Sequence, residues 1–137
     1  MDENVGTLMA KVARLLRRSF DERARGIGVT RPQWQVLSLL MLHAGSNQGA
    51  LAEMLEVEPI TLGRMIDRMQ DAGLVERRAD PNDRRAWRVF LTPSGESRLE
   101  DLKPLANELF ADAVSGLTDS QQAELEAMLD IIRLNLT

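Results

Sequence analysis

The sequence of 137 residues predicts a single, mainly α-helical domain with one small β-hairpin. Apolar residues recur at helical spacing in several long segments, and most of these segments begin with a capping signal. Two strand-like runs flank one turn-forming run, "DPND", at positions 80–83. Aromatic residues make up only 4% and Tyr is absent, which disfavours an all-β fold because strands favour aromatic side chains.

The first helix is expected between Val5 and Arg25, where the apolar residues share one helical face. They occupy positions 5, 8, 9, 12, 15, 16 and 20. Gly26 and Gly28 are expected to end this helix, because glycine readily adopts the left-handed backbone found at helix ends.

Capping residues predict where the next two helices begin. Thr30 and Gln33 match a capping box, so a second helix should run from this point to about His43. The loop "AGSN" follows, and Asn47 is a suitable N-cap for a short third helix that ends near Leu55.

The segment "EVEPITLGRMIDRMQDAGL", residues 56–74, predicts an amphipathic helix between Pro59 and Gly73. Its apolar stripe consists of Leu62, Met65, Ile66 and Met69. Thr61, Arg64 and Arg68 fall on the opposite face. An exposed face with one Thr and two Arg is typical of a helix that lies in the DNA major groove. A solvated amphipathic helix with no ligand is the alternative.

The preceding short helix favours the DNA-binding interpretation. Apolar residues at Leu51, Leu55, Val57, Leu62 and Met65, together with the small Ala52, match the internal spacing of a helix-turn-helix. Glycine often occupies the turn of this motif, and here that position is Glu56.

The runs "LVERRA" and "WRVFLT" predict the two strands of the hairpin, because Trp87, Val89 and Leu91 alternate with other residues at strand period. The residues 80–83 between them suit a type I turn, with Asp first and Pro second. We expect a connection longer than a tight two-residue turn, so that the hairpin projects. A helix-turn-helix followed by a projecting hairpin is a winged helix.

Two further helices complete the predicted chain. Thr92 and Pro93 provide the cap and first residue of a long helix. Thr118 and Gln121 form a second capping box, and a final helix should run from there to about Leu134.

The net charge of −4 conceals an uneven distribution of charge along the chain. Residues 11–31 contain seven basic and two acidic residues (+5), residues 59–91 contain seven and five (+2), and residues 92–137 contain three and nine (−6). A polyanion responds to the local field rather than to the total charge, so the positive segments are compatible with a nucleic-acid partner.

Residues 51–95 resemble the MarR family of bacterial winged-helix transcriptional regulators. The resemblance rests on "LA" at 51–52, "GLVER" at 73–77 and the pattern D-x-R…LT-x-x-G at 83–95. The flanking helices agree with the family in length and order, although their sequences are less specific. The resemblance therefore covers the whole chain.

The resemblance implies a winged helix-turn-helix lobe over about 31–92, with N- and C-terminal dimerisation helices over about 3–25 and 93–136. Two copies would form a homodimer through these intertwined helices, and a monomeric helix bundle is the alternative. The apolar residues of the C-terminal helices that are consistent with a dimer are Leu99, Leu102, Leu105, Leu109, Leu125, Met128, Leu129 and Ile132.

The resemblance also implies which residues contact DNA. The major-groove role falls on Pro59, Ile60, Thr61, Arg64 and Arg68 of the predicted recognition helix. In the wing, Asp83 would orient Arg85 and Arg84 would reach a phosphate or the groove edge. Arginine suits a narrow A·T-rich minor groove, because the negative potential there attracts its guanidinium. Solvated arginines at a turn are the alternative.

A regulatory ligand, if one exists, is expected to be a small organic molecule. The resemblance implies a pocket between the dimer helices and the DNA-binding lobe, often for aromatic acids, where Arg17 would bind a carboxylate and Trp34 would stack. Core packing for Trp34 and solvation for Arg17 are the alternatives. The absence of Cys excludes regulation by thiol oxidation, and a single His disfavours a metal site and catalysis; no cofactor is expected.

The sequence thus predicts a cytoplasmic, homodimeric transcriptional regulator that binds double-stranded DNA at a pseudo-palindromic operator, acts as a repressor and is released by the effector. The N-terminal Asp2 and Glu3 disfavour a secretion signal, and no apolar run is long enough for a membrane helix. The alternative is a non-catalytic winged-helix module that binds a protein, because Asp67, Asp71 and Glu76 lie close to the basic face.

Overall fold

The computed structural model describes residues 3–137, which form six helices and one two-stranded antiparallel sheet. The elements are α1 (Val5–Arg25), α2 (Arg31–Leu42), α3 (Gln48–Leu55), α4 (Pro59–Asp71), β1 (Val75–Asp80), β2 (Asp83–Leu91), α5 (Pro93–Ala113) and α6 (Asp119–Leu136). This confirms the predicted winged helix-turn-helix fold with long helices at both ends.

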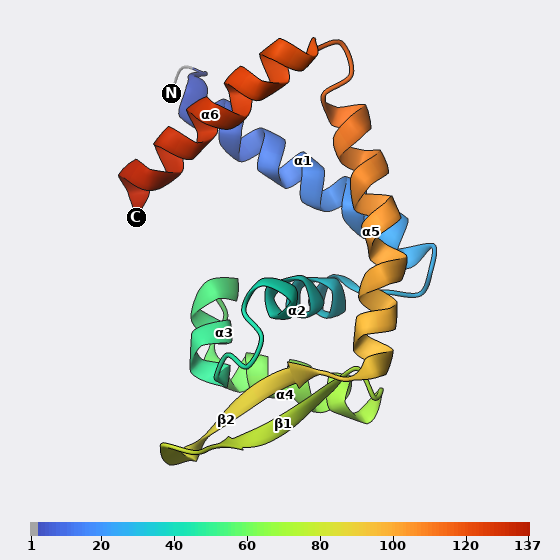
Figure 1. The fold of residues 1–137 in the computed structure, drawn as a ribbon, viewed down its shortest axis with the longest axis vertical. Coiled ribbons are helices and arrows are strands. Elements are labelled where there is room, and N and C mark those ends of the chain that lie inside the picture. Colours follow the sequence, from blue (N-terminus) through green and yellow to red (C-terminus); the bar gives the residue numbers. More distant parts are fainter. Residues whose placement is uncertain (1–2) are drawn as a thin grey trace.

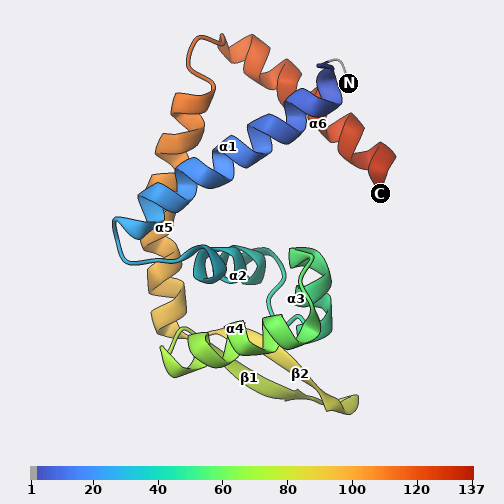
Figure 2. The same cartoon turned by 180° about the vertical axis from the view of Figure 1, so that it is seen from behind.

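The elements separate into two ends of the molecule. Helices α2, α3 and α4 and the hairpin lie together at one end, whereas α1 and α6 lie at the other (Figures 1 and 2). Helix α5 starts at the hairpin and runs towards α1, which it contacts. No helix within residues 3–137 has both the length and the apolar character needed to cross a membrane.

Side-chain caps set the starts of several helices. The capping boxes predicted at Thr30 with Gln33 and at Thr118 with Gln121 are both present, each with reciprocal bonds between side chain and backbone. Asn47 caps α3 by accepting a hydrogen bond from the Ala50 N–H at 2.7 Å. These starts follow from local sequence because a cap satisfies backbone donors within three residues of itself.

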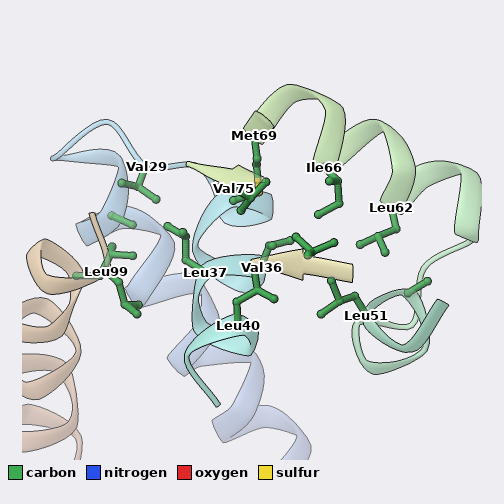
Figure 3. Packing of buried hydrophobic residues seen from close by; sticks show 14 residues of the cluster. Val29, Val36, Leu37, Leu40, Leu51, Leu62, Ile66, Met69, Val75 and Leu99 are labelled. Atoms are coloured by element: carbon green, nitrogen blue, oxygen red, sulfur yellow. The ribbon is translucent and has the colours of Figure 1, made fainter. Parts of the chain in front are cut away.

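The main core lies between α2, the helix-turn-helix and the hairpin (Figure 3). The helix α4 contributes Leu62, Ile66 and Met69, each at most 2% exposed, which confirms most of the predicted apolar stripe. Leu99 and Leu102 of α5 belong to the same core. These two leucines therefore pack within the chain, where α5 meets α1, α2 and the hairpin.

The backbone at the start of α5 lies very close to the backbone at the base of the hairpin. A Cβ atom on Gly95 would lie 2.0 Å from the carbonyl oxygen of Leu74, so no larger residue fits there without movement of the backbone. The same carbonyl accepts a hydrogen bond from the Thr92 N–H at 3.1 Å. The glycine of the LT-x-x-G pattern is thus required by the packing of α5 against the base of the wing.

The connection between the strands is shorter than expected. Asp80 pairs with Asp83, which leaves a two-residue turn of Pro81 and Asn82. The Asp80 carboxylate accepts a hydrogen bond from the Asn82 N–H at 2.9 Å and so stabilises this tight turn. The prediction of a longer loop was wrong, and the hairpin projects because its strands are extended rather than because its loop is long (Figure 1).

Candidate nucleic-acid interface

Helix α4 presents its polar face to solvent. All five residues predicted for the major groove are exposed, namely Pro59, Ile60, Thr61, Arg64 and Arg68. Pro59 occupies the first turn of the helix. A backbone N–H at this position has no intrahelical acceptor, so proline, which lacks the N–H, costs no hydrogen bond there. The buried opposite face fixes the rotation of α4, and this rotation determines which side chains point outwards.

The turn before α4 depends on one strained residue. Glu56 has φ 56° and ψ 42°, the left-handed conformation that the helix-turn-helix usually reserves for glycine. This conformation allows the Val57 N–H to donate a 3.0 Å hydrogen bond to the carbonyl of Ala52. Only Glu56, Val57 and Glu58 separate α3 from α4, as the helix-turn-helix pattern predicts.

At the tip of the wing, Asp83, Arg84 and Arg85 are all exposed. The register of the hairpin shifts at this point, so residues 84–86 have no pairing partners on β1. The Asp83 carboxylate accepts a hydrogen bond from the backbone N–H of Arg85 at 3.0 Å. The predicted brace therefore acts on the backbone of Arg85 in this structure, and the guanidinium stays available.

A second carboxylate, which the sequence analysis overlooked, organises the wing. The Asp80 side chain is 13% exposed and forms an ion pair with Arg88 at 3.4 Å. The hydrogen bond from the Asn82 N–H, assisted by the guanidinium of Arg88, lowers the pKa of Asp80 although partial burial opposes this. The position of Asp80 at the start of the turn was the signal that could have revealed this role.

Arg77 joins the wing to both helices of the helix-turn-helix. Its guanidinium donates to the side chain of Gln48 on α3, and on α4 to the Gln70 side chain at 2.9 Å and the Gly63 carbonyl at 3.1 Å. It also forms an ion pair of 2.7 Å with Asp67. In the sequence, Arg77 stands out only as a basic residue at the end of the GLVER motif, because nothing in its local pattern shows which helices lie beside β1.

A cavity of about 360 Å³ separates the start of α4 from the wing. Its walls come from the start of α3, from Pro59, and from Arg85 to Trp87 on β2. Trp87 lines this cavity and is 48% exposed. The two predicted DNA-contacting elements therefore flank a hollow surface on one end of the molecule.

The basic residues of α1 do not contribute to this surface. Helix α1 lies at the opposite end from α4 and the wing (Figures 1 and 2). Within this segment, Arg23 forms an ion pair with Asp112 of α5 at 3.0 Å. Six of the seven basic residues between positions 11 and 31 lie on α1, so most of this positive charge is at the end away from α4 and the wing; the seventh, Arg31, is the first residue of α2.

The residues predicted for an effector pocket lie near the junction of α1 and α2. Trp34 donates a 2.7 Å hydrogen bond from Nε1 to Asp21 and packs edge-on against Phe20 with ring centroids 4.9 Å apart. Arg31 also binds Asp21, and this hydrogen bond is the main reason why the pKa of Asp21 is lowered. Arg17 is exposed on α1. The effector role of Arg17 and Trp34 stays a prediction.

A separate cavity of about 440 Å³ lies between α2, the hairpin and α5. It is lined by Phe90, Leu99 and seven other residues, and neither Arg17 nor Trp34 is among them. The guanidinium of Arg78 lies over the Phe90 ring, 4.1 Å from its centroid, at the edge of this cavity.

Comparison with known proteins places this geometry in a family. The sequence model of the MarR family matches residues 29–87. A MarR transcriptional regulator from Methanosarcina mazei Go1 has a similar structure, with a TM-score of 0.85 and 30% identity over 96% of this chain and 94% of that one. Wild-type MarR from E. coli in its apo form has a TM-score of 0.85 and 29% identity over 96% and 98%.

A further similar structure contains nucleic acid. It is a mutant MarR from E. coli complexed with operator DNA, with a TM-score of 0.77 and 30% identity over 93% of this chain and 92% of that one. The similarity extends over the N- and C-terminal helices as well as over the winged helix-turn-helix. The chain belongs to the MarR family of transcriptional regulators.

Proposed function

We propose that this protein is a homodimeric, non-catalytic repressor that acts in the cytoplasm and binds a pseudo-palindromic DNA operator. The observation that carries the proposal is the exposed face of α4, where Thr61, Arg64 and Arg68 point away from the core and the wing stands beside them. Thr and Arg are suited to the donors and acceptors on base edges in the major groove. The similarity to an E. coli relative that is complexed with operator DNA supports DNA binding by this chain.

In the proposed complex, α4 enters the major groove and the wing reaches the adjacent minor groove. The sugar-phosphate backbone between the two grooves would then cross the cavity beside Pro59 and Arg85. Arg84 and Arg85 would contact phosphates or the narrow minor groove, because the shifted register leaves both outside the strand pairing.

The faces of α1 and α6 support assembly of two copies. Helix α6 buries no residue within the chain. The large apolar side chains exposed on these two helices are Val5, Leu8, Val12, Leu15, Leu125, Met128, Leu129, Ile131, Leu134 and Leu136. Apolar surface of this extent is normally covered by a partner. We therefore assign dimerisation to residues 3–25 and 93–136 and DNA binding to residues 31–92, as one MarR-like domain.

The junction between these parts suggests how an effector would act. Asp21 of α1 holds both Arg31 and Trp34 of α2 through its carboxylate. An aromatic acid that entered here would offer a competing carboxylate to Arg31 or Arg17 and an aromatic ring to Trp34. Replacement of the Asp21 contacts would release α2 from α1 and change the spacing of the two DNA-binding lobes.

The alternative, a module that binds a protein, rests on three acidic residues close to the basic face. Two of these three residues are already paired with arginines within the chain. Asp67 is paired with Arg77 and Glu76 is paired with Arg78. Their negative charges are thereby offset, and the exposed face of α4 presents the unopposed guanidinium groups of its own arginines.

The test is selection of binding sites from a random duplex library at near-physiological salt. We expect an inverted repeat whose half-sites are about 10 base pairs apart from centre to centre. Arg64→Ala should cost roughly 1–3 kcal/mol and relax the preference at one base pair of each half-site. Arg84→Ala should weaken all duplexes similarly and reduce the salt slope by about one. A folded, dimeric protein that enriched no sequence would contradict the proposal.

A further inference from the structure

Ile60 is an unusual residue for the exposed face of α4. Its side chain is 72% exposed, and no other large apolar side chain of this helix is exposed. The core contacts of α4 are already made by Leu62, Ile66 and Met69 on the opposite face. Ile60 is therefore not part of the buried core of the domain.

Local helix formation does not explain Ile60 either. A β-branched side chain lowers helix propensity slightly, because its χ1 angle is restricted by the preceding turn. At an exposed position in the first turn of a helix, a polar residue would serve the fold at least as well. What distinguishes Ile60 from other exposed apolar residues is its place on the face of α4 proposed to meet DNA, one helical turn before Arg64.

The position of Ile60 on this face indicates which group of the DNA it would contact. The thymine methyl group is the apolar feature that a base edge presents in the major groove, and it is recognised by apolar side chains. The stiffness of isoleucine favours such a contact, because little rotamer freedom is lost when the side chain meets the methyl group. Building on the proposed function, we propose that Ile60 reads a thymine by packing against its C5 methyl group.

The geometry of α4 also restricts where this thymine lies. Ile60 and Arg64 are four residues apart, so their Cβ atoms are about 5–6 Å apart on one face of the helix. Successive base pairs are about 3.4 Å apart along the duplex. The thymine read by Ile60 therefore lies within about two base pairs of the base that Arg64 contacts, and Arg64→Ala identifies that base.

Deoxyuridine substitution tests this assignment directly. Each thymidine of the selected operator is replaced in turn by deoxyuridine, which keeps the base pair and removes only the methyl group. For the parent protein we expect one position in each half-site where the affinity falls about fourfold, the factor expected when one buried methylene group is lost. For Ile60→Ala, the same substitution should have no effect, so the two changes are coupled in a double-mutant cycle.

Leu42→Ala is the matched control, because Leu42 is also 72% exposed but lies at the end of α2. This variant should retain the full sensitivity to deoxyuridine. The assignment is overturned if the parent binds every deoxyuridine operator as tightly as the original, or if Ile60→Ala stays sensitive at the same position. The scan with the parent does not depend on the folding of any variant.

The same measurements separate the two proposals. Suppose that the protein binds its operator with normal affinity, but that no loss of a thymine methyl group has an effect that depends on Ile60. This outcome overturns only the thymine assignment. Failure of the folded parent protein to prefer any duplex overturns both the proposed function and the assignment that rests on it.

Discussion

At the residue scale, Glu56 shows how a sequence can depart from a motif while the structure keeps its geometry. The backbone of Glu56 adopts the left-handed conformation with φ 56°, although its Cβ atom makes that conformation unfavourable. The described part of the chain has no other non-glycine residue with positive φ. The strain persists because the buried residues of α3 and α4 determine the path of the turn between them.

Glu56→Gly should therefore stabilise the protein. Glycine removes the steric cost of the left-handed backbone, which is roughly 1–2 kcal/mol, although it also increases the entropy of the unfolded chain. We expect a net gain of about 1 kcal/mol in the free energy of unfolding, measured by urea denaturation at fixed protein concentration. Glu53→Gly, in the interior of α3, is the control and should destabilise. Equal or lower stability of Glu56→Gly would show that the turn is not strained.

At the element scale, Arg77 holds three elements in one arrangement. It lies on β1, is 17% exposed in its side chain, and binds groups on both α3 and α4. In the proposed complex, the wing and α4 contact adjacent grooves at the same time. The relative position of these two elements thus depends on a guanidinium with donors in several directions.

Arg77→Lys and Arg77→Met should both weaken operator binding, because neither side chain can reproduce the planar set of donors. Loss of hydrogen bonds to a charged group should also lower the free energy of unfolding by about 1.5–3 kcal/mol. Affinity is measured where each variant is still folded, as shown by circular dichroism. Arg78→Lys, at the more exposed neighbouring position, is the control. An Arg77→Met variant with parental affinity and stability would contradict this role.

Asp21 likewise connects two elements, because its carboxylate on α1 binds side chains of α2. Its side chain is 15% exposed, and the hydrogen bond from Arg31 lowers its pKa below the ordinary value for aspartate. A carboxylate whose pKa is lowered on folding stabilises the protein above its unfolded pKa of about 3.9. That contribution is lost as the pH falls through the lower, folded value.

Asp21→Asn should therefore destabilise the protein at pH 7 and have a smaller effect near pH 3. The measurement is the difference in unfolding free energy between parent and variant across this range. Asp130→Asn is a suitable control, since Asp130 is exposed and pairs only with Arg133 on its own helix. A destabilisation by Asp21→Asn that did not diminish at low pH would mean that the charge on Asp21 is not what joins the two helices.

At the scale of the whole molecule, the surfaces proposed for DNA binding and for dimerisation lie at different ends. The polar face of α4 and the wing lie at one end, whereas the uncovered apolar faces of α1 and α6 lie at the other (Figures 1 and 2). A dimer formed at one end would hold two copies of the DNA-binding end at a fixed spacing. The separation also explains why the basic residues of α1 do not serve the DNA surface.

Assembly through α6 is tested by Leu129→Glu, which places a charge on its exposed apolar face. The parent should sediment at twice the chain mass of 15.3 kDa, and the variant should sediment as a monomer. The variant should also lose most of its affinity for the full inverted repeat, because one copy contacts one half-site. Ile60→Glu, at a more exposed position on α4, is the control and should remain a dimer. A dimeric Leu129→Glu protein would exclude this face from the interface.

The sequence by itself determined the features that depend on neighbouring residues. The capping boxes at Thr30 and Thr118, the buried stripe of α4 and its exposed arginines all follow from spacings of a few residues. The pattern of motifs between residues 51 and 95 indicated the family, and the comparisons confirm it. Such features are readable because caps and helical faces are set within one or two turns of the chain.

Only the tertiary structure decided which distant groups meet. It paired Arg77 with α3 and α4, buried Leu99 in the main core, and placed α1 at the end of the molecule away from α4. It also replaced the expected loop of the wing with a tight turn held by Asp80. These outcomes depend on the packing of elements against one another, and a pattern within one segment contains no information about its neighbours in space.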